Sequence, residues 1–423
     1  MNTKTGSSGS DADGRGRSDI GAPGDQALPG PGAGGGAANF EHARRVELDG
    51  AARRGLDARM HAAAEAVWRA GRLCRYVQRG AAARAEGPER IIKSDGSPVT
   101  IGDYGAAAVI ARELNARGML SGGAAGKGAR LISEEDSVFL RRPEGARHVE
   151  SAVSALRASG AWADATGPAF LDAIDLASRA VERDGEDEHG PFWAADPIDG
   201  TKGFVRGQQY AVCLALVERG QPVVAAIACP NLSNDPARGA ELDDGPGIVA
   251  AASASDREPG VIVWSARDGG GAAESGKHVA LDDLRCERAM RLPGVGAGGV
   301  RVARSPEHGH SDRSTQTRVI NGLGDAFVSH EVDGQGKYVM VALGRAEVYL
   351  RIPPRAGARE NVWDHAPGVL IAERGGAAAT DAHGAPLWFG GSKLSRSWGI
   401  VAAEPETHQK ILRVLEEMRA GRG

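Results

Sequence analysis

Two aspartates, Asp196 and Asp199, stand three residues apart directly after the apolar run at residues 192–195. An apolar run followed by Asp-Pro-Ile-Asp-Gly predicts a buried strand that ends in a turn, so both carboxylates would point at one place. These carboxylates and the main-chain carbonyl of Ile198 are hard oxygen ligands of the kind that magnesium prefers.

The residues after these aspartates add a contact for phosphate. Main-chain amides around Gly200 and Thr201 remain available to bind a phosphate oxygen. Together with the two carboxylates, they predict a magnesium-dependent phosphatase. For Asp-Pro-x-Asp-Gly taken by itself, an ordinary type I turn is the alternative.

A second group of acids, Glu134 and Glu135, follows the short apolar strand predicted at residues 131–133. If this strand lies parallel to the strand before Asp196, the two strand ends meet at one edge of a sheet and their acids can share metal ions. A solvated surface or a helix start is the alternative, because runs of acids usually have one of those roles.

Each of two further aspartates precedes a predicted helix. Asp103 opens the run at residues 104–116, and Asp364 comes shortly before the run at 369–374. From these segments alone, the simpler interpretation of either residue is a helix N-cap that accepts hydrogen bonds from amides of the first turn. For Asp103, this role and a catalytic role are compatible.

The sequence Asp-Pro-Ile-Asp-Gly-Thr-Lys-Gly-Phe at residues 196–204 resembles the signature of the lithium-sensitive phosphatases related to inositol monophosphatase. The ending Thr-Lys-Gly-Phe is most similar to the 3'(2'),5'-bisphosphate nucleotidase branch. The sequence Trp-Asp-His-Ala at residues 363–366, followed by a helix, Gly-Gly and Thr-Asp, resembles the second signature of the same family. Both signatures occur in the family's order, and the resemblance covers residues 56–401.

This resemblance implies a role for each acid. The implied metal ligands are Glu134, Asp196, the carbonyl of Ile198, Asp199 and Asp364. Asp103 and Thr201 would together activate the attacking water, and Glu135 is a neighbour of the site. Ser133 stands where the family usually has glycine, and Pro367, where it usually has alanine, suits a first helical turn.

The resemblance also implies a substrate pocket, formed by Gly200, Thr201, His310, Ser311, Lys337 and Arg351. Lys202 is a further pointer to nucleotides. For His310, an ordinary surface histidine in a turn is the alternative. For Lys337 and Arg351, a solvated charge is the alternative. Gly334 stands three residues before Lys337, where the branch usually has serine, so one nucleotide hydrogen bond would be missing.

The activity implied is removal of the 3'-phosphate of adenosine 3',5'-bisphosphate, giving AMP and phosphate, with Mg²⁺ as cofactor and direct attack by a metal-activated water. 3'-Phosphoadenylyl sulfate would be a second substrate, and lithium inhibition is expected. Two alternatives stay open: an inositol (poly)phosphate phosphatase, because the metal motifs are shared across the superfamily, and a non-catalytic nucleotide-sensing protein. All the expected metal carboxylates are present, which argues against the sensor.

The elements that must position these residues predict a layered α/β protein. The family resemblance implies an αβαβα sugar-phosphatase-like fold. We expect a disordered tail at residues 1–40, an N-terminal α+β domain with the metal site at 41–230 and a C-terminal α/β domain at 231–423. A mostly small apolar face at residues 60–77 predicts a closely packed helix. Residues 122–129 and 182–188 have the composition of inserted loops.

The composition limits the partners. Lys plus Arg number 51 against 55 acids, a net charge of −4, so neither nucleic acid nor a membrane surface is expected as the main partner. The four cysteines lack disulfide or metal-type spacing, which predicts a reduced, intracellular protein with buried thiols at Cys213 and Cys229. We expect a cytoplasmic monomer that acts on a small-molecule nucleotide; a transit peptide in the tail is the alternative, disfavoured by the tail's acids.

Overall fold

The computed structural model describes residues 50–83, 90–92, 98–120, 128–181, 190–232, 260–267, 277–280, 283–288, 299–307, 309, 311–324, 326–355, 357–394 and 396–421. Residues 45–423 form one compact unit. Several sequence predictions concern residues outside the described ranges: the tail at 1–40, most of the loop at 122–129, the loop at 182–188, and His310.

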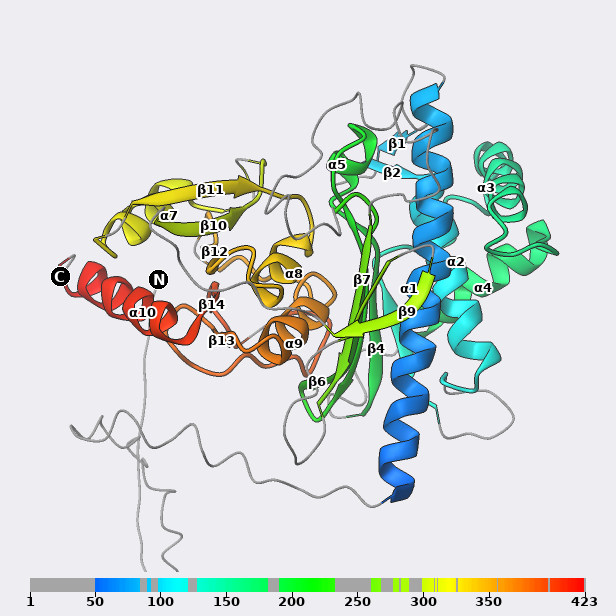
Figure 1. Ribbon diagram of the computed structural model, residues 1–423. Coiled ribbons are helices and arrows are strands. Elements are labelled where there is room, and N and C mark those ends of the chain that lie inside the picture. Colours follow the sequence, from blue (N-terminus) through cyan, green and yellow to red (C-terminus); the bar gives the residue numbers. More distant parts are fainter. Residues whose placement is uncertain are drawn as a thin grey trace, which may run out of the picture. The chain divides into compact units, whose positions relative to one another are not determined.

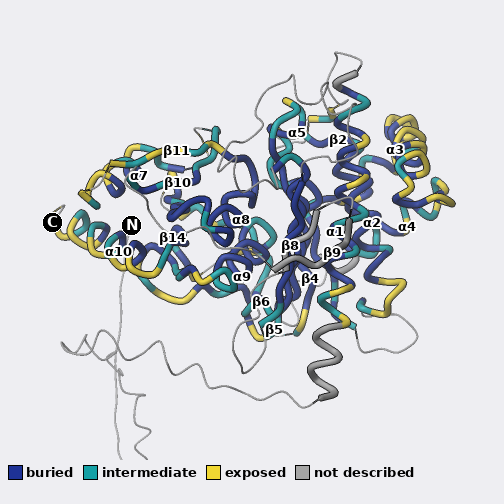
Figure 2. Tube along the Cα trace, in the orientation of Figure 1, coloured by how far each residue is buried: buried dark blue, intermediate teal, exposed yellow. Residues whose placement is uncertain are grey.

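A seven-stranded sheet lies at the centre of the first half of the chain, in the order β3-β4-β5-β6-β7-β8-β9. Its strands are β3 (Arg130–Ser133), β4 (Phe192–Asp199), β5 (Ala211–Glu218), β6 (Gln221–Cys229), β7 (Val261–Ala266), β8 (Lys277–Ala280) and β9 (Asp283–Arg288). β3 and β4 are parallel, and every later neighbour is antiparallel. Figure 2 shows that β4, β5 and β6 are buried almost throughout.

Both faces of this sheet are covered, because side chains that alternate along each strand enter two different cores. In β5, Val212, Leu214 and Leu216 belong to one core. Ala211, Cys213, Ala215 and Val217 belong to the other. The continuous apolar runs of the sequence are therefore strands whose two faces are both covered by protein. The thiols of Cys213 and Cys229 are buried and free, as predicted.

Helices α1 (Gly50–Ala83) and α2 (Ile101–Ala116) cover the first face of the sheet, and α3 (Ala146–Ala158) and α4 (Gly167–Val181) pack against α2 (Figure 1). The predicted small apolar face lies on α1. It packs closely: a Cβ on Gly105 of α2 would lie 2.5 Å from Leu73 Cδ2 of α1. The hairpin of β1 (Arg90–Ile92) and β2 (Pro98–Thr100) leads directly into α2.

Helices α8 (Gly336–Ala342) and α9 (Ala366–Arg374) contact each other; α9 packs against the seven-stranded sheet, and both helices also contact a second sheet (Figure 1). That sheet has the order β11-β10-β12-β14-β13. Its strands are β10 (Val300–Arg304), β11 (Phe327–Glu331), β12 (Val348–Arg351), β13 (Ala378–Thr380) and β14 (Ile400–Ala403). Helices α7 (Arg313–Asn321) and α10 (Pro405–Ala420) share a third core with this sheet. The alternating layers agree with the α/β class predicted from the sequence.

The first sheet takes strands from both sides of the domain boundary that the sequence predicts near residue 230. β7 pairs with β6 over six residue pairs, from Val224–Ala266 to Cys229–Val261. This pairing buries the apolar residues of β7 that would otherwise face water. Among the described residues, the helices do not combine the length and the apolar run needed to cross a lipid bilayer.

Candidate active site

The acid that follows β3 and the first acid of β4 lie side by side, because the two strands pair in parallel. Ser133 is in register with Ala195, and the Glu134 amide donates to the Ala195 carbonyl at 3.4 Å. Glu134 therefore lies next to Asp196 at the same end of the sheet. The parallel arrangement predicted from the sequence is confirmed.

The prediction that β4 ends before its carboxylates is wrong, since the strand continues through Pro197 to Asp199. Asp196 pairs with Cys213 and Asp199 with Ala211, so three steps along β4 match two along β5. Residues three apart normally point to opposite faces of a strand, but the extra residue of this irregularity brings both aspartates to the same face. That face is the one that looks toward α8 and α9, since Cys213 and Ala211 belong to the core on that side.

Asp103 lies in the first turn of α2, but it is not the N-cap. Thr100 is the N-cap, and Asp103 is the third helical residue of a reciprocal capping box: its Oδ2 accepts from Thr100 N at 2.8 Å and Thr100 Oγ1 at 2.7 Å. The sequence misplaced the helix start because β2 and α2 adjoin without a loop. The buried carboxylate keeps Oδ1 for Thr201, whose Oγ1 lies 3.3 Å away.

Thr201 is the first residue of the short helix α5 (Thr201–Val205). Its hydroxyl also lies 3.1 Å from the carbonyl of Ile198. The hydroxyl proton is thus directed toward Asp103 or Ile198, and a lone pair of Oγ1 stays available as an acceptor. The predicted pair of Asp103 and Thr201 is in contact.

Asp364 is likewise not a helix N-cap, because the N-cap of α9 is His365 and Pro367 lies in the first turn. The Asp364 carboxylate instead accepts from Asn361 Nδ2 at 3.0 Å. Its side chain is part of the electrostatic cluster around β4, although 165 residues separate it from Asp199 in the sequence.

Burial and mutual repulsion raise the pKa values of Asp196, Asp199 and Asp364. Burial, followed by repulsion from Glu134, Asp199, Asp364 and Asp103, raises the pKa of Asp196 well above its usual value. Burial and the same kind of repulsion raise the pKa of Asp199 to about 6, against the lowering effect of Lys337, and that of Asp364 to about 8. Asp196 Oδ1 is buried without a hydrogen-bond partner among the described residues. A set of buried oxygen donors that repel one another suits a hard divalent cation.

Two cations, the buried Lys337 and the half-buried Arg351, lie beside the acids. Burial lowers the pKa of Lys337, although Asp199 and Asp333 oppose the shift, and its Nζ donates to the carbonyls of Val332 and Gly334. Arg351, at the end of β12, is disfavoured as a cation by burial, but Tyr349 and Glu360 more than offset this and raise its pKa. Both residues stand where the sequence predicts substrate contacts.

Ser311 is buried, and its hydroxyl is fully used within the protein. Its Oγ donates to Ile352 O at 2.9 Å and accepts from Ile352 N at 2.9 Å and Gln316 Nε2 at 2.8 Å. In this conformation the hydroxyl holds the end of β12 and has no capacity left for a nucleotide. His310, its predicted companion, lies outside the described residues.

A turn at residues 332–337 from the second half packs on the segment that follows Asp199. Gly334 has φ +63°, and a Cβ there would lie 2.2 Å from the Asp199 carbonyl oxygen. A Cβ on Gly203 would lie 2.5 Å from Asp333 Oδ2. The glycine at 334, a departure from the serine expected there, is thus required by the close approach of two backbones.

Ion pairs join the segment after Asp199 to this turn and to Glu307, which follows β10. Arg206 donates to Asp333 Oδ2 at 2.8 Å and to Glu307 Oε1 at 2.7 Å. Lys202 Nζ donates to Glu307 Oε2 at 3.2 Å, and its side chain is half-exposed. Lys202, expected as a pointer to nucleotides, is therefore engaged with a carboxylate at the edge of the site.

Three residues that shape the site were not predicted as site residues from the sequence: Asp333, Glu360 and Asn361. Asn361 contacts Asp364, Glu360 contacts Arg351, and Asp333 contacts the segment after Asp199. The polar pair of Asn361 and Asp364, three residues apart, is the one local signal in the sequence. Glu360 and Asp333 could not be identified, because their roles depend on partners that only the fold brings close.

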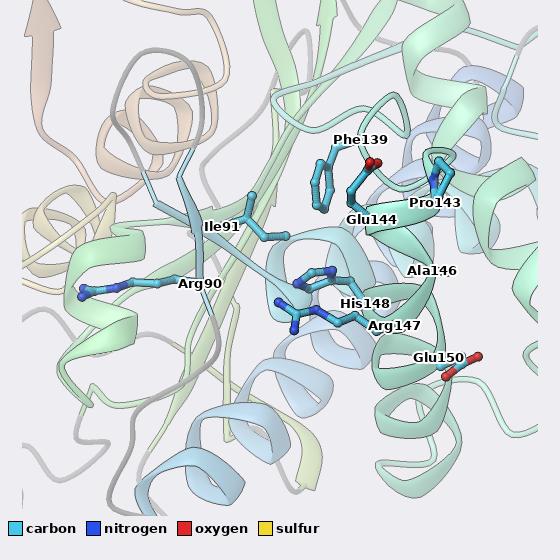
Figure 3. A pocket seen from close by; sticks show the side chains of 9 residues that line it. All are labelled: Arg90, Ile91, Phe139, Pro143, Glu144, Ala146, Arg147, His148 and Glu150. Atoms are coloured by element: carbon cyan, nitrogen blue, oxygen red, sulfur yellow. The ribbon is translucent and has the colours of Figure 1, made fainter.

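A cavity of about 700 Å³ lies apart from this site, between β1 and the start of α3 (Figure 3). It is lined by Arg90, Ile91, Phe139, Pro143, Glu144, Ala146, Arg147, His148 and Glu150. Its two arginines and two glutamates balance in charge. Because none of the predicted site residues lines it, the cavity is not the candidate active site.

Comparisons with known proteins find relatives of this chain. The model of the inositol monophosphatase family matches residues 171–420. A 3'(2'),5'-bisphosphate nucleotidase of Schizosaccharomyces pombe is 32% identical over 372 residues, which are 84% of this chain and 94% of that protein. One of Oryza sativa is 32% identical over 367 residues, 85% of this chain and 94% of that protein. A solved structure, CysQ from Bacteroides thetaiotaomicron, is 20% identical with a TM-score of 0.48 and covers 82% of this chain and 97% of that one.

Replacing Gly334 with alanine should disturb both stability and the site. We expect Gly334→Ala to cost clearly more than the roughly 1–2 kcal/mol of a left-handed backbone, because the new Cβ meets the Asp199 carbonyl. Gly118→Ala is the matched control, with φ +68° and open space around the Cβ position. Thermal unfolding of the two variants measures the difference; equal losses would show that the two backbones are not in close contact.

The metal-free protein should lose stability as pH rises from about 4 to about 8. Asp199 and Asp364 hold their protons in the folded chain up to pKa values of about 6 and about 8, against 3.8 for an ordinary aspartate. The folded state therefore binds more protons across this window, and the free energy of unfolding falls by up to about 1.4 kcal/mol per pH unit for each such group. Denaturation with a chelator measures this slope.

Saturating magnesium should flatten that slope, since the cation binds the ionised carboxylates. The control is Asp364→Asn, which should lower the slope in the chelator. A slope that is absent without metal, or equal with and without magnesium, would contradict the clustered acids.

Proposed function

This chain belongs to the inositol monophosphatase family and to its 3'(2'),5'-bisphosphate nucleotidase branch, and from this premise we propose the reaction that it catalyses. The chain hydrolyses the 3'-phosphate of adenosine 3',5'-bisphosphate, giving AMP and inorganic phosphate, and also accepts 3'-phosphoadenylyl sulfate. Relatives that carry the nucleotidase name align over most of their length, which favours a nucleotide over an inositol phosphate. The complete set of acids favours an enzyme over a sensor.

The observation that best supports the proposal is the buried carboxylate of Asp196, whose Oδ1 has no hydrogen-bond partner within the described part of the chain while other acids surround it. We propose that the cluster holds Mg²⁺ through Glu134, Asp196, the Ile198 carbonyl, Asp199 and Asp364. Magnesium would neutralise the phosphoryl oxygens, lower the pKa of water and stabilise the leaving 3'-oxygen. An all-oxygen donor set suits this ion.

Asp103 and Thr201 would orient the attacking water. The Thr201 hydroxyl directs its proton toward Asp103 Oδ1 or the Ile198 carbonyl, which leaves Thr201 Oγ1 to accept a hydrogen bond from water. Asp103 is held in place by Thr100 at two points on its other oxygen. A rigid acceptor of this kind turns a lone pair of the water toward the phosphorus.

The remaining groups would hold the substrate. Amides around Gly200 and Thr201 bind the reacting phosphate, and the charges of Lys337 and Arg351 attract the anionic nucleotide. Two of the three Lys337 protons are donated to main-chain carbonyls, so this residue contributes mainly through its charge.

Phosphate release from adenosine 3',5'-bisphosphate should exceed release from inositol 1-phosphate and inositol 1,4-bisphosphate in magnesium. Asp199→Asn should reduce kcat/KM for the nucleotide by about 10²-fold or more, since it removes a metal ligand. Asp172→Asn, at an acid whose side chain is 70% exposed, should leave the rate unchanged. Preference for an inositol phosphate would overturn the branch but leave the metal site, and tight nucleotide binding without turnover would favour a sensor.

Changing Thr201 should separate its hydroxyl from its shape. Thr201→Val should lower kcat by about 10²–10⁴-fold, because the water loses its acceptor, whereas Thr201→Ser should stay within about tenfold of the native rate. Single-turnover phosphate release at saturating nucleotide and magnesium measures both. Native activity in the valine variant would remove Thr201 from the mechanism.

A further inference from the structure

Glu360 holds Arg351 by two parallel hydrogen bonds. Arg351 Nε donates to Glu360 Oε1 at 2.9 Å and Arg351 Nη2 donates to Oε2 at 2.8 Å. The side chains are only 19% and 14% exposed. A paired carboxylate and guanidinium with this geometry fixes the plane of the guanidinium as well as its place.

The backbone at Glu360 is itself anchored. Its carbonyl accepts from Leu394 N at 2.9 Å, and the next residue, Asn361, forms a bridge with Lys393. The carboxylate is therefore attached to a fixed segment, three residues before the turn that carries Asp364. Any group that Glu360 orients is oriented relative to the candidate metal site.

A buried imidazole lies on the other side of the Glu360 carboxylate. His365 Nε2 is 3.6 Å from Glu360 Oε2, beyond a hydrogen bond but within ion-pair range, and His365 Nδ1 lies 2.9 Å from the Tyr338 hydroxyl. The Tyr338 ring packs edge-on against the ring of Tyr349, which stands two residues before Arg351 on β12. The carboxylate thus lies between two buried basic groups and has little room to rotate.

The pairing leaves one edge of the guanidinium for a ligand. A guanidinium has five N–H groups, and Glu360 accepts two of them, on Nε and Nη2. The planar fork directs the N–H groups of Nη1 away from Glu360. The charge of Arg351 also acts on Asp199, so this edge lies within electrostatic reach of the acids on β4.

The resemblance to the nucleotidases implies that Arg351 helps to hold the non-reacting phosphate of a bisphosphate substrate. We propose that Glu360 is the positioning residue that fixes Arg351 for this contact. The inference rests on the proposed function and deepens it, since it assigns the choice between a bisphosphate and a monophosphate to this pair. A guanidinium without its carboxylate partner would be free to rotate and would bind a second phosphate less well. The reacting phosphate, held at β4, does not depend on the pair.

A metal site is the competing interpretation. Glu360, Asp364 and His365 each offer one ligand atom, and these atoms lie within 4.8 Å of one another. Both oxygens of Glu360 are already bonded to Arg351, so a cation there would lie against a guanidinium. The pairing with Arg351 therefore explains Glu360 better than metal binding does.

The test compares adenosine 3',5'-bisphosphate with adenosine 3'-monophosphate, which lacks the second phosphate. Glu360→Gln should raise KM for the bisphosphate about 10- to 100-fold, the size expected for a lost charge-assisted contact, and leave kcat nearly unchanged. KM for the monophosphate should stay the same. Arg351→Lys, which keeps the charge without the fork, should give the same selective loss if the first variant folds poorly.

The matched control is Glu347→Gln. Glu347, directly before β12, is bonded to Arg301 of β10 in another partly buried ion pair. Its replacement should therefore lower Tm without changing the ratio of the two KM values. Equal losses for both substrates in Glu360→Gln, or no change, would overturn the proposal. Loss of the stabilisation by Mg²⁺ in that variant would also overturn it and make Glu360 a metal ligand. If the native protein does not hydrolyse the bisphosphate at all, it is the proposed function that fails.

Discussion

The site depends on one electrostatic constraint: several carboxylates at the proposed metal site, of which Asp196 is buried and the others are half-buried, lie together and repel one another. Removing even one carboxylate from water is unfavourable unless it is neutralised, paired or bound to a cation. This repulsion is largely uncompensated around Asp196. Its Oδ1 atom has no hydrogen-bond partner in the described part of the chain. This unrelieved charge suits the cluster to divalent cations, and the layers of the fold hold its acids in place.

Both halves of the chain are needed to build this cluster. The first sheet brings Glu134 next to Asp196, and the irregularity in β4 turns Asp199 to the same face. The second half adds Asp364 and the close turn at Gly334, which presses against Asp199. Arg351 and Lys337 then place positive charge at the border of the acids. The proposed metal site and the proposed substrate site are thus one structure, and a change in either half acts on both.

Much of the site could be predicted from the sequence, because its acids follow apolar strands or precede helices, and local patterns reveal such positions. The parallel pairing of β3 and β4 follows from these patterns, whereas the contact of Asp103 with Thr201 follows from the family resemblance. The same local patterns gave a wrong prediction for Asp103 and Asp364, because neither residue is a helix N-cap. Glu360 and Asp333 could not be predicted from the sequence. An isolated glutamate or aspartate gives no local pattern that identifies a partner brought close only by the fold. From the sequence, Gly334 predicted only the loss of one hydrogen bond to the nucleotide. The structure shows that this glycine allows close backbone contact with Asp199.

The most direct test of the account is anomalous diffraction from crystals of the protein grown with Mn²⁺ in place of Mg²⁺. The account predicts anomalous peaks among Glu134, Asp196, Asp199 and Asp364, with one in contact with the Ile198 carbonyl. Peaks absent from this cluster, or found only at Glu360 and His365, would contradict the claim that the buried acids form the metal site of the enzyme.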